Sequence, residues 1–148
     1  MTRKSNKTTN RLIFGSGNNK LARIIDHISL PSGWSCPGAA ACKARAIETD
    51  SGRWVIEDGR NTSFRCFSAS EEALYTGARN IRWRNWELLR EARTAHNMTK
   101  LILSSIPTHK RTTLPTVAGR EYSNVIRGHV GGDFFSQSYF DAWLSVCI

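Results

Sequence analysis

The stretch from Val125 to Ser136 constrains the fold of this chain more than any other. It reads as a short apolar strand that ends at Gly131-Gly132 and leads into a helix beginning at Ser136 to Ser138. In α/β folds such a loop gathers ligands, because the strand fixes a side chain and the helix offers free N–H groups. The pattern predicts a cofactor-binding turn made by His129, Gly131, Gly132 and Asp133. The alternative is a plain turn in which Asp133 or Ser136 caps the helix and His129 has a core or surface role.

The other periodic segments predict an α/β or α+β fold in one small domain, with a partial barrel as one form of it. Strands are expected at Ile24–Leu30 and Asn124–Val130. One long helix is expected from Ser68 to about Ala95, where Ser68 and Glu71 have the spacing of a capping box. Its expected buried face is Leu74, Ala78, Ile81, Leu88 and Ala92. A second helix is expected over Asn97–Ile106, and a terminal helix should bury Phe140, Trp143, Leu144 and Cys147.

Three shorter segments carry weaker signals. Residues 15–19, Gly-Ser-Gly-Asn-Asn, read as a turn, although Gly-x-Gly can also cradle a phosphate. Residues 34–44 read as a turn that becomes a short Ala-rich helix, with Cys42 within it or at its start. Asp58-Gly59 between Trp54–Glu57 and Ser63–Phe67 predicts a hairpin.

The charge of the chain favours a polyanionic partner. The net charge is +9, and six basic residues precede the first acid, Asp26. We expect residues 1–10 to form a disordered basic arm and residues 11–148 to form a single globular domain. The arm contacts nucleic acid or simply keeps the protein soluble. No run of about 18 apolar residues predicts a membrane span, and no apolar segment near the N-terminus predicts secretion, so we expect a cytoplasmic protein.

A basic and aromatic set in the long predicted helix suggests a nucleic-acid surface. Arginines bind phosphates and tryptophans stack on bases. The set comprises Arg79, Arg82, Trp83, Arg84, Trp86 and Arg90. The alternative is that the tryptophans belong to the core and the arginines form a solvated face paired with Glu87 and Glu91.

Three cysteines suggest a metal centre. Cys36 lies in the loop before the predicted Ala-rich helix, Cys42 lies in that helix, and the predicted hairpin would bring Cys66 near both. In a cytosolic chain cysteines favour metal binding, catalysis or core packing over disulfides. Their spacing does not match a zinc finger, and the alternative is that Cys42 packs as a small hydrophobe.

Four blocks of sequence, in the same order, resemble the bacteriophage "gene product 88" family. The resemblance implies no particular activity. Members usually continue beyond the Asp141-Ala142-Trp143 helix, so the chain resembles a short or C-terminally truncated member of a host-cytoplasmic phage family. The blocks are Ser29-Leu30-Pro31-Ser32-Gly33-x-Ser35-Cys36-Pro37-Gly38-Ala39-x-x-Cys42, Phe64-Arg65-Cys66-Phe67-Ser68-Ala69-Ser70-Glu71, Arg82-Trp83-x-Asn85 and His129-Val130-Gly131-Gly132-Asp133-Phe134-Phe135-Ser136.

At motif level the chain is also similar to radical S-adenosylmethionine enzymes, in which early cysteines precede a later glycine-rich turn. That resemblance implies a [4Fe–4S] cluster on Cys36, Cys42 and Cys66, with Asp133 near S-adenosylmethionine. The alternative within this prediction is that the same three cysteines bind a different metal.

Three functional hypotheses follow. The first is a cysteine-ligated metal or iron–sulfur protein, either an enzyme or the remnant of one. The second is a non-catalytic nucleic-acid-binding protein that uses the arm and the Arg/Trp helix. The third is an accessory protein that acts through contacts with host proteins.

Overall fold

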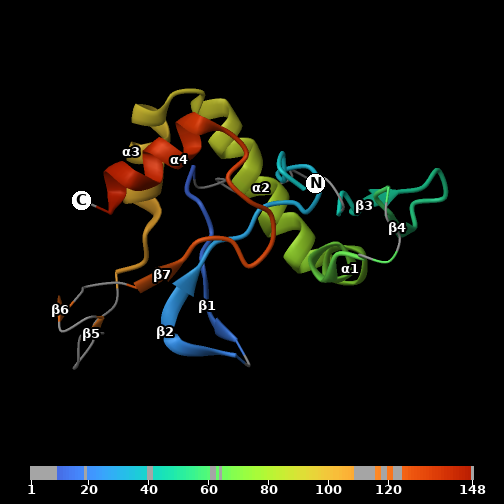
Figure 1. Cartoon of the computed structure of the whole chain (residues 1–148), viewed down its shortest axis with the longest axis horizontal. Coiled ribbons are helices and arrows are strands. Elements are labelled where there is room, and N and C mark those ends of the chain that lie inside the picture. Colours follow the sequence, from blue (N-terminus) through green and yellow to red (C-terminus); the bar gives the residue numbers. More distant parts are fainter. Residues whose placement is uncertain are drawn as a thin grey trace, which may run out of the picture.

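The computed structural model describes residues 10–147, apart from 19, 40–41, 61–62, 64, 109–115, 118–119 and 122–124. It shows a small mixed α/β fold in which a three-stranded sheet has the order β1-β2-β7. Helices α2, α3 and α4 gather at one end of this sheet, and the β3–β4 hairpin lies beyond α1 (Figure 1). The described strands form no closed barrel. The predicted arm, residues 1–10, lies outside the described residues except for Asn10.

Two parallel strands bring the predicted turn next to the predicted cysteine loop. β2 (Leu21–His27) pairs in parallel with β7 (Val125–Arg127). The pairing continues beyond both strands, because Val130 N donates to Ile28 O (3.2 Å) and Leu30 N donates to Gly131 O (2.8 Å). Of the strands predicted at Ile24–Leu30 and Asn124–Val130, the first halves are confirmed, since β2 ends at His27 and β7 at Arg127. Their common end places Pro31-Ser32 beside Gly131-Gly132.

The glycine-rich segment before β2 is a strand and not the predicted turn. β1 (Gly15–Asn18) pairs antiparallel with β2, and the register shifts between Ser16 and Asn18. Gly17 has φ +60°, which glycine adopts at little cost. Gly17 therefore lies at the irregularity of an edge strand.

The long helix predicted from Ser68 is two helices. α1 (Phe67–Leu74) and α2 (Thr76–Ala92) are separated by Tyr75, whose φ of −113° and ψ of 103° are extended. The predicted capping box was wrong: the N-cap is Cys66 and makes no side-chain cap bond. The Ser68 and Glu71 side chains instead bind Arg82 of α2. The break at Tyr75 turns α1 back so that this contact forms.

The buried face of α2 also differs from the prediction. Leu74 is 74% exposed and Ile81 is 38% exposed. The helix instead buries Arg79, Arg82, Asn85, Trp86 and Leu89, whose spacing of three and four residues defines one helical face. The polar groups of Arg79, Arg82 and Asn85 find partners in α1, in Ile13 before β1 and in the loop after β2, so polar side chains of α2 point inward.

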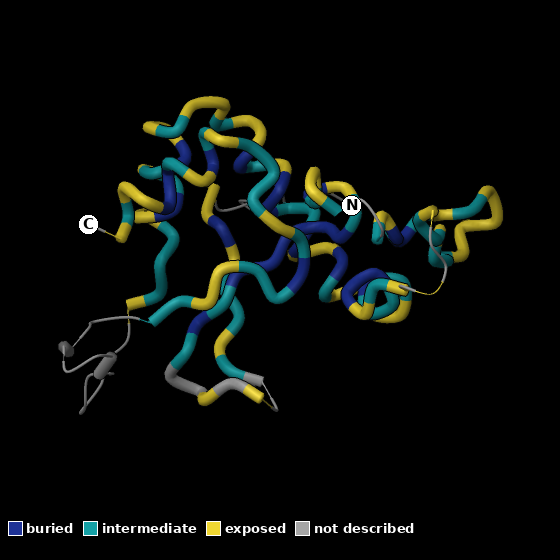
Figure 2. The backbone as a smooth tube through the Cα atoms, in the orientation of Figure 1, coloured by how far each residue is buried: buried dark blue, intermediate teal, exposed yellow. Residues whose placement is uncertain are grey.

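The last two helices complete the core, which is visible as the dark-blue segments of Figure 2. α3 (Ala95–Ser105) packs on α4 (Gln137–Val146). Both predicted helices are confirmed, and Ser136 caps α4 by accepting from Tyr139 N (3.2 Å). The expected inner face of α4 was partly wrong, because it buries Tyr139, Ala142 and Trp143 and leaves Phe140, Leu144 and Cys147 exposed.

The hairpin forms one segment earlier than predicted. β3 (Arg45–Glu48) pairs antiparallel with β4 (Trp54–Glu57), and Gly52 lies in the connecting turn with φ +77°. Phe67, expected to end a strand, begins α1. A second small ladder pairs β5 (Thr116–Val117) with β6 (Arg120–Glu121).

The predicted Ala-rich helix is absent from the described residues of 38–44. The reason is a close approach of backbones on both sides of Lys43-Ala44. A Cβ at Gly33 would lie 2.7 Å from Ala44 O, and one at Gly59 would lie 2.5 Å from Lys43 N. This tertiary packing holds the chain extended despite the helix propensity of alanine. Within the described part of the chain, no helix has the length and apolar character needed to cross a membrane.

Candidate functional site

A buried arginine joins the segments that the sequence singled out. Arg82 of α2 is 4% exposed and donates from Nη1 to Ser68 O (2.9 Å), Ser68 Oγ (2.8 Å) and Glu72 Oε1 (2.9 Å). Its Nη2 forms an ion pair with Glu71. Glu72 is 0% exposed, and its Oε1 also accepts from Ser32 N (2.9 Å). The ion pair therefore ties α2 to α1 and to the loop after β2, and its hydrogen bonds offset the cost of burying both charges.

The two glycines of the predicted cofactor turn pack against this network. A Cβ on Gly131 would collide with Ser68 Oγ and lie 3.0 Å from Arg82 Cζ. One on Gly132, at φ +79°, would collide with Ser35 Oγ. Glycine is needed at both positions, because Gly131 packs closely on α1 and α2 and Gly132 on the loop after β2.

Two buried oxygens of this region have no hydrogen-bond partner among the described residues. They are Ser32 Oγ and Glu72 Oε2, and both residues are fully buried. Neighbouring Ser35 Oγ is satisfied, since it donates to Pro31 O (2.7 Å). Buried polar atoms without partners are unusual in folded proteins and occur most often at functional sites.

Cys66 interacts with both other predicted cysteines. It lies close enough to both for it to contribute to their raised pKa values. All three are free thiols of intermediate burial. Burial is the main cause that raises the pKa of the Cys36 and Cys42 thiols, and the nearby Cys66 raises both further. The structure thus places the three predicted residues in one neighbourhood, while Cys147 lies exposed at the end of α4.

The arrangement of these thiols is not that of a formed metal site. Among the described residues no group of three or more His, Cys, Asp or Glu could hold a metal ion as it lies. Asp133, the other predicted acid, is near enough to Cys36 to raise its pKa. Its Oδ1 accepts from Phe134 N (2.8 Å), so Asp133 does not cap α4, and the alternative prediction of a capped helix is met by Ser136.

His129 belongs to an aromatic cluster. Its Nε2 lies 3.0 Å from the Tyr139 hydroxyl, and its ring meets Phe134 edge-on with 4.7 Å between centroids. Burial lowers the pKa of His129 to about 4, an effect that the Asp133 charge only partly opposes. His129 is therefore neutral at pH 7. Its φ of +52° directs the chain into the Gly131-Gly132 turn.

The six residues proposed for nucleic-acid binding are mostly engaged inside the molecule. Arg79, Arg82 and Trp86 are buried. Arg79 donates to Glu72 O (2.6 Å) and lies 3.9 Å from the Trp54 ring centroid.

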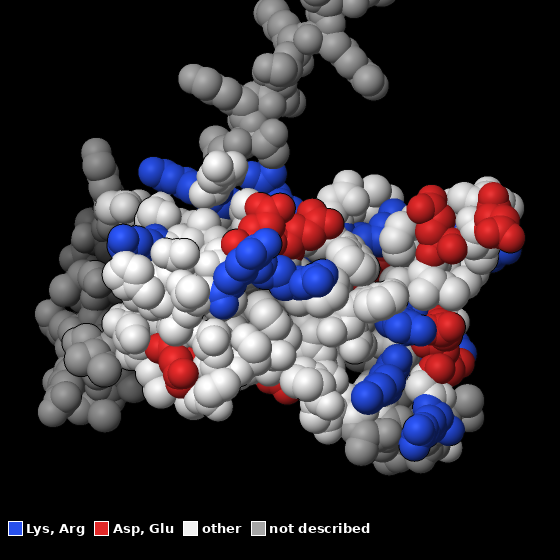
Figure 3. All heavy atoms as spheres, turned by 90° about the horizontal axis from the view of Figure 1, so that it is seen from above, with Lys and Arg blue, Asp and Glu red and all other residues white. Residues whose placement is uncertain are grey.

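The remaining three members extend this packing. The Trp83 ring meets the Trp86 ring edge-on at 5.2 Å, Arg84 is half-buried, and exposed Arg90 covers the Trp86 ring. Lys and Arg side chains on the face shown in Figure 3 alternate with Asp and Glu and form no single basic patch.

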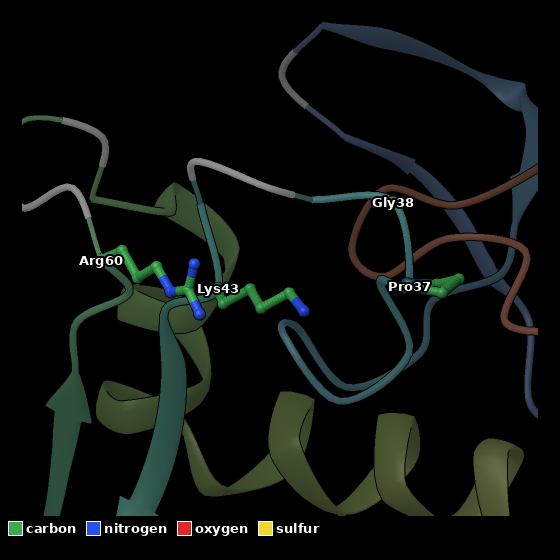
Figure 4. A pocket seen from close by; sticks show the side chains of 4 residues that line it. All are labelled: Pro37, Gly38, Lys43 and Arg60. Atoms are coloured by element: carbon green, nitrogen blue, oxygen red, sulfur yellow. The ribbon is translucent and has the colours of Figure 1, made fainter.

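A pocket that the sequence did not reveal lies next to the cysteine segment. It encloses about 360 Å³ and is lined by Pro37, Gly38, Lys43 and Arg60 (Figure 4). Pro37 and Lys43 directly follow Cys36 and Cys42 in the chain. The sequence indicates one part of this pocket, because Arg60 belongs to the Asp58-Gly59-Arg60 turn that predicts a hairpin.

Comparison with known proteins identifies the family. A sequence profile described as "Gene product 88" matches residues 1–148. The "Gene 88 protein" of Mycobacterium phage L5 is 29% identical over 139 residues, which cover 93% of this chain and 48% of that protein. The "Gene 88 protein" of Mycobacterium phage D29 is 28% identical over 142 residues, covering 95% and 49%. The chain spans about half the length of these relatives, and no solved structure matches it. The likeness to radical S-adenosylmethionine enzymes stays at motif level, whereas the profile match over the whole chain shows that it belongs to the Gene product 88 family.

Proposed function

We propose that Cys36, Cys42 and Cys66 bind a thiophilic metal centre, with a [4Fe–4S] cluster as the principal form and a single metal ion as the simpler one. The observation that carries this proposal is that Cys66, which lies on a different segment of the chain, is near enough to Cys36 and Cys42 to raise the pKa of both thiols. Thiolates are the usual ligands of iron–sulfur clusters and of structural zinc.

The donor set fits such a centre in number and in kind. Three thiolates would leave one coordination position for an exogenous ligand, where the centre supplies electron transfer or Lewis acidity. Because the thiols do not yet have metal-binding geometry, the segment that carries Cys36 and Cys42 must adjust on binding. Gly132 packs closely against Leu30 and Ser35, just before Cys36, and limits that adjustment.

The thiols also determine how binding depends on pH. Burial raises the pKa of Cys36 and Cys42, so both are protonated at neutral pH and must release protons to bind a metal. We therefore expect affinity for Co²⁺, used as a spectroscopic probe, to increase between about pH 6.5 and pH 8.5. A pH-independent affinity in direct titrations would contradict ligation by these thiols.

The decisive experiment is the iron and sulfide content of protein purified without oxygen. We expect both elements, with a broad absorbance near roughly 400 nm, in the parent protein. The Cys36→Ala, Cys42→Ala, Cys66→Ala triple variant should lose them, whereas Cys147→Ala should keep them, because Cys147 lies exposed on α4. Folded, metal-free parent protein that also fails to take up iron, zinc or cobalt would overturn the proposal. S-adenosylmethionine is to be tested only on protein that holds a cluster.

Nucleic acid binding has less support. It draws on the net charge of +9 and on the arm, while two arginines of the predicted surface are buried: Arg82 pairs with Glu72, and Arg79 donates to the Glu72 carbonyl. The test of nucleic-acid binding is a gel shift that weakens with salt, made with variants of Arg90 rather than of Arg82, since Arg82 supports the fold.

Binding of a host protein partner is supported by no specific contact.

A further inference from the structure

We propose that the pocket formed by Pro37, Gly38, Lys43 and Arg60 binds a small anion that carries a phosphate or carboxylate group. The Lys43 and Arg60 side chains come from different segments and extend together toward the side on which the Pro37-Gly38 turn lies (Figure 4). This inference rests on charge and shape, and it does not depend on the proposed metal centre.

The two cations have no acidic partner among the described residues. The acids nearest to Arg60 in sequence are engaged elsewhere: Glu57 pairs with Arg45, and Asp58 accepts from Arg65 Nε (3.0 Å) and Nη2 (2.7 Å). The bond from Arg65 holds the pKa of Asp58 below its usual value, so this carboxylate stays charged and paired. The positive charge of the pocket is therefore uncompensated by the described chain.

The backbone holds the two cations close together. The Gly59 Cα lies so near Lys43 that a Cβ would be 2.5 Å from its N and 3.1 Å from its Cα. On the other side, a Cβ at Gly33 would lie 3.1 Å from Lys43 O. Lys43 is thus fixed between two segments, and Arg60 directly follows one of them. Folding has already brought the two like charges together, so an anion that binds between them does not have to position them.

The side chains suit an anion of moderate size. The arginine guanidinium donates in a fork that matches two oxygens of a carboxylate or phosphate, and the lysine ammonium adds a compact charge. A volume of about 360 Å³ is at the lower end of ligand pockets, which favours a small molecule over a polymer. Because Cys36 and Cys42 are adjacent in sequence to Pro37 and Lys43, a bound anion would lie beside the thiols.

The test is calorimetric titration of the full chain with inorganic phosphate and, separately, with succinate, at constant ionic strength set by sodium chloride. We expect saturable binding of at least one, and the stronger of the two identifies the group. In Lys43→Met, Arg60→Met the dissociation constant should rise at least about tenfold. The control Arg90→Met, Lys100→Met removes two exposed cations elsewhere and should bind like the parent.

A second variant separates position from charge. Gly59→Ala keeps both cations but pushes the Arg60 segment away from Lys43, and should also weaken binding. The triple cysteine variant should retain binding, so the two proposals can fail separately. No saturable binding of either anion, equal binding by the double variant, or far tighter binding of a single-stranded oligonucleotide would overturn the inference. Circular dichroism of every variant verifies that it is folded.

Discussion

Arg82 shows how one charged side chain can organise a fold. Its guanidinium is shared among Ser68, Glu71 and Glu72, and Glu72 in turn binds the backbone of Ser32. A buried charge is tolerated only when its partners replace water. The network therefore specifies that α1 and the loop after β2 pack on α2, because apolar contacts alone would allow other partners.

Removing Arg82 should destabilise the protein strongly. In Arg82→Met the side-chain volume is nearly kept, but Glu72 is left as an uncompensated buried carboxylate. We expect a loss of about 3–5 kcal/mol in the free energy of unfolding, measured by urea denaturation. Arg90→Met, which removes an exposed arginine over Trp86, should cost below about 1 kcal/mol. Equal losses in the two variants would show that the network contributes nothing special.

His129 should make stability depend on pH. Its pKa is about 4 in the folded protein and about 6.5 when unfolded, so the unfolded chain binds more protons between these values. Stability is then complete above about pH 6.5 and falls as the pH drops to about 4, by roughly 3 kcal/mol. His129→Asn, which tolerates the positive φ, should flatten this dependence, whereas His96→Gln on the exposed surface of α3 should preserve it. An unchanged slope in His129→Asn would rule out this origin.

At the scale of elements, local sequence patterns predicted the strands and helices that depend mainly on contacts between residues close in the chain. The strands through Ile25 and Ile126 and the helices α3 and α4 follow from apolar runs and end signals. The α1–α2 break and the inward polar face of α2 do not, because they depend on pairing between segments far apart in the chain. An inward arginine looks the same in sequence as a solvated one.

The glycines provide a test at this scale. Gly131→Ala should lower the free energy of unfolding by about 1–3 kcal/mol, because its Cβ would enter space held by Ser68 and Arg82. Gly77→Ala in α2, where nothing lies within 4 Å, should raise it by about 0.5 kcal/mol through helix propensity. Thermal and urea unfolding measure both. A neutral Gly131→Ala would mean that the turn does not pack against α1 and α2 as described.

At the scale of the whole molecule, the fold has a central core and a peripheral hairpin. The core joins the segment that follows β2 with α2, α3 and α4. The β3–β4 hairpin packs on α1 and reaches α2 through Arg79 and Trp54. Two-stranded ladders are marginal without such support.

Amide hydrogen exchange should reflect this division. We expect amides of β3 and β4 to exchange at least about tenfold faster than those of β2 and α2, because local opening of the hairpin requires less free energy than global unfolding. Mass spectrometry of peptic fragments measures it. Uniform protection across Ala46 and Ile28 would instead indicate one cooperative unit.

The sequence pointed to candidate residues, but it did not show which of them are in contact in the folded chain. The cysteines and the Gly131-Gly132 turn were singled out from residue types and turn signals, and in the structure Gly132 packs against Ser35, next to Cys36 in the chain. Glu72, Ser32 and the Lys43/Arg60 pocket were missed. Their importance arises from burial or from the lack of a charged partner, which become visible only when distant segments are placed in space.

Contacts between tryptophan rings connect the loop that contains Cys36 to α2 and affect the absorption and emission of the chain. Trp34, two residues before Cys36, meets Trp83 at 5.7 Å and 60°, and Trp83 meets Trp86 at 5.2 Å and 71°. Indoles at such separations couple their electronic transitions, so a displacement of the cysteine loop would alter the near-ultraviolet circular dichroism and the emission of the chain. The protein thus carries an intrinsic reporter for whatever this loop binds.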